Sequence, residues 1–484
     1  MSELGTNILP KGWAWKTLPD LVSDDGVFID GDWVESKDQD PNGNVRLIQL
    51  ADVGDGVYRD KSDRFMTKAK ADKLGCTFLK EGDVLIARMP DPLGRACIFP
   101  GDPKPSVTVV DVAIVRSGNS EFDHRWLACF VNANPFRSAI SGLQAGSTRK
   151  RISRGNLATI PLPVPPLPEQ RRIVAEIEKQ FTRLEAGVAA LRRVQANLKR
   201  YRAAVLKAAC EGRLVPAEAE RLKAEGEGLK DFESGEQLLK RILNYRRQNW
   251  QGRGKYKEPV TPDTTKLPHL PKGWAWATTQ QLNLSNRPCA YGVLQPGDDI
   301  PDGVLFVRVG DINNGNVDLS NLKRISPTIA AKYPRTKLHG GELAITLVGA
   351  IGRTAIIPES LAGGNTARAV GIIPLTKEVN AHWVEIWFRN PAKTAEMDSK
   401  SHEVARKTLN LEDVRVASIA LPPLAEQTRI VAEVERRLSV VEELEAVVSA
   451  NLQRATRLRQ SILQKAFTGE LCAPEAVPTK EHYS

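Results

Sequence analysis

Residues 9–15 read Leu-Pro-Lys-Gly-Trp-Ala-Trp, and residues 270–276 repeat the same seven letters. A second pattern, Glu-Gln-x-Arg-Ile-Val-Ala-Glu, stands at 169–176 and again at 426–433. The two patterns keep the same order along the chain. Because repeats in a fixed order mark a duplicated structural unit, we infer that the chain contains two copies of one unit.

We call the repeated motifs the frames and the segments between them the inserts. The sequence similarity between the two inserts is low. Gly94-Arg95 parallels Gly352-Arg353, and Arg149-Lys150 parallels Arg406-Lys407, but most other positions differ. An old duplication that had merely drifted would erode frames and inserts alike. Constant frames around divergent inserts favour one scaffold that recognises two different targets.

A long amphipathic helix is predicted after the first Glu-Gln pattern. It starts at Pro168, whose fixed φ suits the first turn, and ends at Gly212 and Pro216. About 43 residues with a rise of about 1.5 Å each would span roughly 65 Å. Apolar residues recur at intervals of mainly three and four, as in a coiled-coil seam. They are Ile173, Ile177, Phe181, Leu184, Val188, Leu191, Leu198 and Val205.

The second copy predicts an equivalent helix that ends at Gly469 and Pro474. Its seam consists of Ile430, Val434, Leu438, Val441, Leu444, Val448, Leu452, Ala455 and Ile462. Because such a stripe is not stable in water, we expect the two helices to pair with each other, antiparallel. The alternative is that each helix packs on its own globular domain.

Each insert is predicted to be mixed α/β, with short strands separated by turns. The β-like runs are Val45–Leu50, Val84–Ala87, Val107–Val115, Val304–Val309, Leu343–Val348 and Ala369–Ile373. Helical stretches follow near Arg125–Val131 and His382–Phe388. The strand order does not follow from these patterns. Between the copies, Ser234 and Gln237 predict a capping box that opens a short helix.

The composition narrows the class of protein. The 484 residues suggest about three domains. Lys and Arg number 68 against 58 Asp and Glu, and the net charge of +10 leans towards a polyanionic partner without proving one. Six scattered cysteines without a Cys-x-x-Cys motif argue against a disulfide framework or a thiolate zinc site. No apolar run approaches the roughly 18 residues of a membrane-spanning helix, so we expect a cytoplasmic protein without membrane contact.

Several motifs of catalysis and cofactor binding are missing from the sequence. There is no G-x-x-x-x-G-K-[ST] loop, no G-x-G-x-x-G after a strand and no H-E-x-x-H. The nearest approach to the Asn-Pro-Pro-aromatic tetrapeptide of amino-methyltransferases is Asn134-Pro135-Phe136, which lacks one proline and is better explained by a turn at a helix end. We therefore expect a non-enzymatic binding protein, with no catalytic, cofactor-binding or metal-binding residues of its own.

The repeated frames resemble the conserved regions of type I restriction–modification specificity subunits. The resemblance rests on Pro-Leu-Pro-Glu-Gln at 166–170, Leu-Pro-Pro-Leu-Ala-Glu-Gln at 421–427, the tryptophan motifs, and Gly212-Arg213-Leu214 against Gly469-Glu470-Leu471. It covers essentially the whole chain. It implies a duplicated α/β (α+β) fold in which two globular target recognition domains are separated by two long antiparallel helices with pseudo-twofold symmetry. The expected segments are a first recognition domain (1–165), a central long helix (166–216), a charged linker with a short helix (217–267), a second recognition domain (268–420), a C-terminal long helix (421–472) and a tail (473–484).

The resemblance also implies a function. Each recognition domain would read one half of a split, asymmetric target in double-stranded DNA, and the paired helices would set the unread gap. Two methyltransferase subunits would dock on the helices, and restriction (motor–nuclease) subunits would join through them. S-adenosylmethionine, ATP and Mg²⁺ would belong to these partners, and the methylated base would be adenine. Two other hypotheses stay open: a self-sufficient DNA methyltransferase or nuclease with unrecognised motifs, and a repeat scaffold that binds only proteins.

The best candidate for DNA contact is the segment 144–154, which is rich in cations and hydroxyls and resembles the family's Gly-Ser-Thr loop. In the second copy, Ser-His-Glu-Val at 401–404 replaces that part, which departs from the family pattern. Arg and Lys are suited to guanine and phosphate, and Gln to adenine. The predicted DNA-binding residues are Arg88, Arg95, Gln144, Ser147, Thr148, Arg149, Lys150, Arg151, Arg154, Arg353, Arg368, Arg406 and Lys407. The tryptophans Trp13, Trp15, Trp274 and Trp276 are expected to be packing anchors rather than base stackers.

Overall fold

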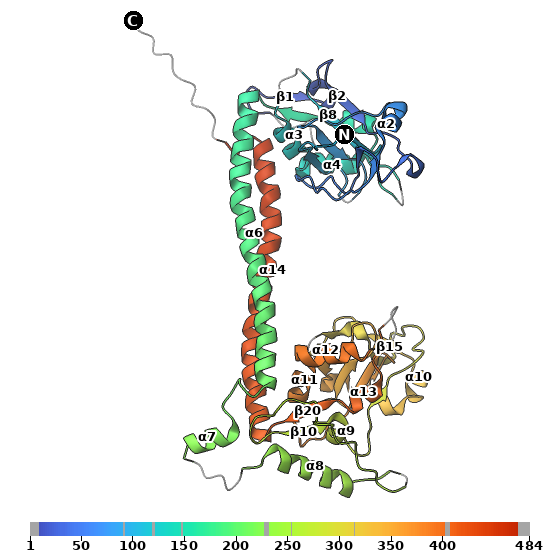
Figure 1. The fold of residues 1–484 in the computed structure, drawn as a ribbon, viewed down its shortest axis with the longest axis vertical. Coiled ribbons are helices and arrows are strands. Elements are labelled where there is room, and N and C mark those ends of the chain that lie inside the picture. The colour runs from blue at the N-terminus through green and yellow to red at the C-terminus, as the bar shows by residue number, and fades with distance from the viewer. Residues whose placement is uncertain are drawn as a thin grey trace. The chain divides into compact units, whose positions relative to one another are not determined.

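The computed structural model describes residues 9–90, 92–118, 122–146, 149–226, 232–252, 254–313, 315–401 and 407–472. The chain divides into two compact units, Met1–Arg193 with Ser449–Ser484, and Val194–Val448. Each unit contains one insert and part of both long helices (Figure 1).

An antiparallel four-stranded sheet forms the centre of the first unit, in the order β2-β8-β5-β6. A three-stranded sheet, β4-β3-β7, pairs β3 with β7 in parallel. The side chains of β5 alternate between two cores: Val84 and Ile86 pack with α3, whereas Leu85 packs in a separate cluster. The elements are β2 (Val27–Asp30), β3 (Val45–Ile48), β4 (Phe65–Met66), β5 (Val84–Ala87), β6 (Ala96–Ile98), β7 (Ser106–Thr108), β8 (Val112–Arg116) and the helices α1 (Leu18–Leu21), α2 (Lys68–Leu74), α3 (His124–Val131), α4 (Asn134–Leu143) and α5 (Arg154–Ala158).

The second unit has the same sheet orders, β11-β19-β16-β17 and β15-β12-β18, again with one parallel pair in the smaller sheet. The two divergent inserts therefore share one topology. The strands are β11 (Ala290–Tyr291), β12 (Val304–Val307), β13 (Ile312–Asn313), β14 (Asn316–Val317), β15 (Lys323–Ile325), β16 (Leu343–Thr346), β17 (Thr354–Ile356), β18 (Asn365–Thr366) and β19 (Val370–Ile373). The helices are α7 (Glu218–Ala224), α8 (Gly235–Gln248), α9 (Thr279–Leu282), α10 (Pro327–Ala331), α11 (Ala381–Arg389), α12 (Pro391–Ser399) and α13 (Leu411–Arg415).

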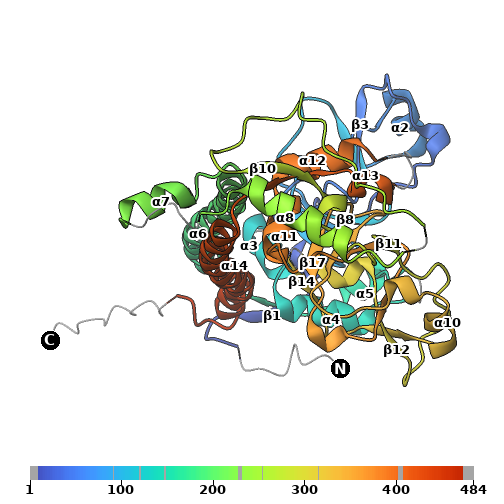
Figure 2. The ribbon, with the colours of Figure 1, turned by 90° about the horizontal axis from the view of Figure 1, so that it is seen from below.

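The two long helices are α6 (Leu167–Cys210) and α14 (Leu424–Phe467). They lie side by side in both views of the ribbon (Figures 1 and 2). In the first unit Arg459 contacts Glu185, and in the second unit Arg202 contacts Glu445 at 2.9 Å. Residue numbers rise on one helix as they fall on the other, so the pair is antiparallel. The predicted pairing is confirmed, and the alternative of two separately packed helices is not.

The predicted seam of α14 is correct except at one position. Val441 and Val448 are buried, whereas Leu444 is 45% exposed. The side chain that follows it, Glu445, meets Arg202 of α6 instead. Leu444 was assigned to the seam because it is apolar, but the alternation of three and four residues from Val441 leads to position 445.

Equivalent joints bind each insert to its long helix. Short antiparallel pairs, β1 (Ala14–Lys16) with β9 (Leu162–Val164) and β10 (Ala275–Thr278) with β20 (Ser418–Leu421), carry the tryptophan motifs. The indole N–H of Trp13 donates to Glu169 at 3.1 Å, and that of Trp274 donates to Glu426 at 2.9 Å. Of the four tryptophans expected to be packing anchors, Trp13 and Trp274 are buried, whereas Trp15 and Trp276 are half-buried.

The repeated glutamine completes each joint. Gln170 donates to the carbonyl of Pro165 at 2.8 Å and accepts the N–H of Asp123 at 2.9 Å. Gln427 makes the same pair of bonds, to Pro422 at 2.9 Å and from Asn380 at 3.0 Å. The repeated glutamine thus occurs at the two positions where the same pair of hydrogen bonds is made.

The linker helix and the strands of the first insert test two further expectations. The capping box of Ser234 and Gln237 is present at the start of α8. The run Val107–Val115, expected as one strand, is instead two strands, because the N–H of Val112 turns back to the carbonyl of Val109 at 3.0 Å. None of the helices in the described part of the chain is long and apolar enough to cross a membrane.

Candidate nucleic-acid interface

The predicted segment 144–154 forms a closed loop in the first unit. Ala145 and Arg151 exchange two backbone hydrogen bonds, of 2.8 and 2.9 Å. Gly146 has a φ of +99°, and a Cβ there would lie 2.3 Å from the carbonyl oxygen of Arg149. Only glycine closes the loop in this way, because a side chain would collide with the backbone.

The loop carries a group of exposed cations. Arg149, Lys150, Arg151 and Arg154 are all exposed, and Gln144 is half-buried at its start. The predicted contacts Ser147 and Thr148 lie outside the described residues. Four positive side chains on one short loop suit contact with a phosphate backbone.

Arg88 lies beneath this loop, and its side chain is only 12% exposed. Its guanidinium donates to the carbonyls of Ile152 at 3.2 Å and Val110 at 2.5 Å, and pairs with Asp30 at 3.1 Å. The N–H of Ile152 in turn donates to the carbonyl of Arg88 at 3.1 Å. We therefore assign Arg88 to positioning the loop, in place of the direct DNA contact expected from the sequence.

Arg95 is buried, with 4% exposure. Its guanidinium donates to four carbonyls, those of Val53 at 2.6 Å, Leu50 at 2.7 Å, and Met89 and Pro92 at 3.1 Å each. All of these acceptors belong to the protein's own loops. Arg95 therefore holds the backbone together, and we do not retain it among the DNA contacts.

A groove of about 1010 Å³ opens beside the cationic loop. Its lining combines hydrogen-bond donors and acceptors, as reading of base edges requires. The polar and charged residues of the lining include Asp32, Glu35, Gln39, Gln49, Arg64, Asp111, Arg149 and Arg151, and Trp33 joins them. Burial raises the pKa of Asp32, whereas a hydrogen bond with Lys37 lowers the pKa of Glu35.

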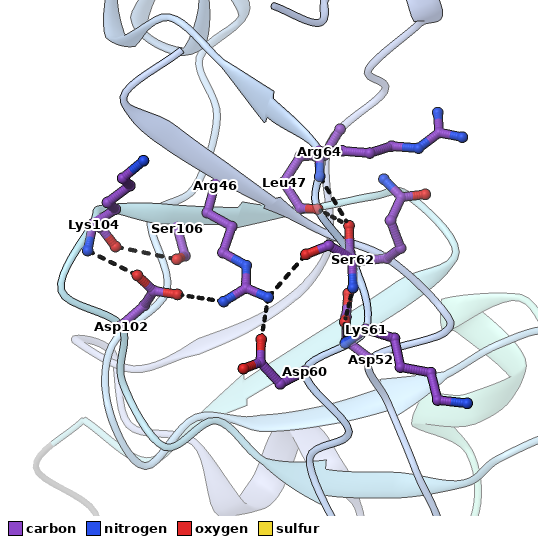
Figure 3. A network of polar contacts seen from close by, with 11 residues as sticks. Arg46, Leu47, Asp52, Asp60, Lys61, Ser62, Arg64, Asp102, Lys104 and Ser106 are labelled. Atoms are coloured by element: carbon purple, nitrogen blue, oxygen red, sulfur yellow. Dashed lines mark hydrogen bonds and ion pairs between the residues drawn. The ribbon is translucent and has the colours of Figure 1, made fainter. Parts of the chain in front are cut away.

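A polar network fixes one wall of this groove (Figure 3). Arg46 donates to Asp102 at 2.8 Å and to the carbonyl of Ser62 at 2.9 Å. Two residues further on, Arg64 points away from this network and donates to Gln39 across the groove lining at 3.0 Å. The network immobilises the segment from which Arg64 extends.

The second unit places its predicted cations differently. Arg353 and Arg368 are both exposed. The backbone N–H of Arg368 donates to the carbonyl of Val293 at 2.8 Å, which fixes the position from which its side chain leaves. Lys407 is exposed too, but its ammonium contacts both carboxylate oxygens of Asp398, at 2.8 and 2.7 Å. Arg406 lies outside the described residues.

Sequence reasoning missed Gln49, Arg64 and Asp111 of the groove. They stand next to the ends of β3, β4 and β8 and meet only through the sheet order. Polar residues at strand ends were the available signal, but without a strand order that signal could not bring the three together. Among the described residues, no group of three or more His, Cys, Asp or Glu is arranged to hold a metal ion.

Comparison with known proteins agrees with this architecture. A family model described as "Type I restriction modification DNA specificity domain" matches residues 10–190. The specificity subunit of the type I restriction enzyme EcoBI from Escherichia coli is 36% identical over 346 residues, which is 71% of this chain and 65% of the relative. The EcoKI specificity subunit of E. coli strain K12 is 26% identical over 363 residues, 72% of this chain and 66% of the relative. The matches thus span slightly less than two thirds of these two relatives.

A solved structure gives independent support for the fold. A chain from a study of the complex assembly and conformational transition of the type I R-M system superposes with a TM-score of 0.63 at 17% identity, covering 96% of this chain and 100% of that one. The sequence matches thus make the chain similar to type I restriction–modification specificity subunits, and the solved structure shows the same fold.

Proposed function

We propose that this chain is the non-catalytic DNA-specificity subunit of a type I restriction–modification complex, and that its inserts read the two halves of a bipartite, asymmetric target. One observation carries the proposal: two inserts with the same sheet orders differ in the residues that line their exposed loops. A scaffold repeated with different surface residues suits the reading of two different half-sites. The similarity to type I restriction–modification specificity subunits supports the same conclusion.

The recognition domains would comprise residues 1–165 and 268–420. The long helices at 166–216 and 421–472, the linker at 217–267 and the tail at 473–484 would complete the chain. We propose that DNA is contacted by the loop cations Arg149, Lys150, Arg151 and Arg154, by Gln144, and by Arg353 and Arg368. Ser147, Thr148, Arg406 and Lys407 stay predictions from the sequence.

The partners follow from the same proposal. Two methyltransferase subunits would dock on the long helices, and restriction subunits would join the complex through them. These subunits would bind S-adenosylmethionine, ATP and Mg²⁺, and the methylated base would be an adenine extruded from the duplex. The complex would act in the cytoplasm, where the chromosome is.

Mapping of methylated adenines tests the proposal. Cells that carry the chain with its partner subunits should show methylation at one split motif, and deletion of this chain should abolish it. Exchange of the 268–420 insert for that of another specificity subunit should change one half of the motif and leave the other unchanged. Methyl transfer by the purified chain alone would instead indicate an enzyme, and a complex without any sequence preference would indicate a protein scaffold.

A further inference from the structure

Two glycines occupy the same place in the two sheets. The N–H of Asp32, after Gly31, donates to the carbonyl of Thr108 at 2.7 Å, and the N–H of Val293, after Gly292, donates to that of Thr366 at 2.7 Å. A Cβ at Gly31 would lie 2.3 Å from the carbonyl oxygen of Val109, and a Cβ at Gly292 would lie 2.1 Å from that of Thr366. Both segments therefore hold their backbone close against the neighbouring strand.

An exposed apolar side chain follows each glycine at the same interval. Trp33 is 71% exposed and Leu294 is 53% exposed. A single exposed apolar residue needs no explanation on its own. Here, however, the position is repeated in two inserts whose sequences otherwise differ, so an explanation by chance exposure is weak.

Trp33 lies beside candidate DNA-binding cations, and Leu294 is next in sequence to a residue that bonds the backbone of another. Trp33 lines the groove together with Arg149 and Arg151. Leu294 follows Val293, whose carbonyl accepts the backbone N–H of the exposed Arg368. An apolar group next to cations that contact phosphates would face the bases rather than open water.

We propose that Trp33 and Leu294 are equivalent apolar wedges, each of which inserts into the base stack at its own half-site. The inference rests on the proposed DNA-reading function and adds two residues to it. Side chains of this kind unstack a base step and recover the cost by contact with the exposed base faces. The indole of Trp33 offers a large flat surface for stacking, whereas Leu294 offers a smaller one, so the first wedge should contribute more to affinity.

Binding of the assembled methyltransferase complex to a duplex that carries its mapped target tests the wedge. Trp33→Ala should lower affinity about 10-fold, within the range measured for loss of one base–aromatic contact. Trp33→Phe should restore most of it. The dependence of affinity on salt concentration should stay unchanged in both variants, because no phosphate contact is lost. An unchanged affinity of Trp33→Ala would overturn the inference.

An abasic scan separates a base contact from a backbone contact. Removal of the base on which Trp33 stacks should bring the affinity ratio of wild type to Trp33→Ala close to one, and removal of other bases should leave the ratio near 10. A ratio that stays constant at every abasic position would refute insertion. If the wild-type complex did not prefer its target to a scrambled duplex, the proposed function itself would fail, which is a separate result.

The second unit provides a matched control. Leu319 is 51% exposed, almost as much as Leu294. It does not, however, occupy the position in the second insert that is equivalent to Trp33. Leu294→Ala should lower affinity several-fold and respond only to abasic sites in the second half-site. Leu319→Ala should bind like the wild type, and an equal loss in both variants would contradict a special role for Leu294.

Discussion

At the scale of single residues, the structure separates arginines that hold the protein together from arginines that are available to a ligand. Arg88 bridges Asp30 and the carbonyls of Val110 and Ile152. Arg88→Met should lower the free energy of unfolding by about 2 kcal/mol, because it leaves two carbonyls and a carboxylate without their charged donor. Arg149→Ala, at an exposed position, should change it by less than about 0.5 kcal/mol. Urea unfolding of both variants provides the measurement, and equal stabilities would contradict the positioning role.

The exposed cations should differ in how much each contributes to DNA binding. Arg149→Ala should weaken binding to all duplexes alike and reduce the slope of log affinity against log salt by about 0.9, as expected for one lost phosphate contact. Lys407→Ala should have a smaller effect, because Asp398 already neutralises that ammonium. Salt titrations of the assembled complex compare the two variants. A larger loss for Lys407→Ala would show that the ion pair with Asp398 opens on the duplex.

The pair Arg95 and Arg353 shows where sequence reasoning reached its limit at this scale. Both follow a glycine in the repeat, but the first is buried under carbonyls and the second is exposed. The segment between β5 and Gly94 is one residue longer than its counterpart, and its carbonyls at Met89 and Pro92 curve around Arg95. The sequence correctly paired Gly94-Arg95 with Gly352-Arg353. The environment of each arginine, however, depends on the geometry of the preceding loop, which the spacing of residues does not encode.

At the scale of elements, the joint between Trp274 and Glu426 should make the stability of the second unit depend on pH. Burial raises the pKa of Glu426, although hydrogen bonds from the Glu218 N–H and from Trp274 oppose the shift. A carboxyl with a raised pKa in the folded state binds its proton more tightly there, so its contribution to stability is present below the unfolded pKa and is lost as pH rises through the folded pKa. The second unit of the wild type should therefore lose stability relative to Glu426→Gln as the pH rises above about 4.5, the ordinary pKa of the carboxyl. Unfolding at several pH values measures the difference, and a constant difference would contradict the shift.

The exposed face of α14 should bind a partner helix. Val440 and Leu444 are 50% and 45% exposed and lie one turn apart on the same face. Leu444→Glu should leave the unfolding free energy nearly unchanged and should weaken docking of a methyltransferase subunit. Light scattering of the mixed subunits measures the stoichiometry. Ser439→Glu, which adds the same charge on a different face of α14, serves as the control and should assemble normally.

The long helices were the most predictable elements, because their apolar stripes repeat over many turns and their ends carry glycine and proline. Their pairing followed from the same stripes. The strands were predictable as runs but not as sheets. The parallel pair of β3 with β7 joins segments 60 residues apart, at Arg46 and Ser106, and no local pattern in either strand names its partner.

At the scale of the whole chain, both units contain part of α6 and part of α14, so two continuous helices join them. Removal of residues 187–193 and 452–458 would delete one heptad from each helix and preserve the seam, because a heptad restores the same face. Each helix would become shorter by about 10 Å, which corresponds to about three base pairs of duplex. If the helices set the unread gap, the variant should methylate the same two half-site sequences with a shorter gap between them. Mapping of methylated adenines in cells that carry the deletion measures this directly, and methylation at the original gap length would show that the helices do not set the spacing.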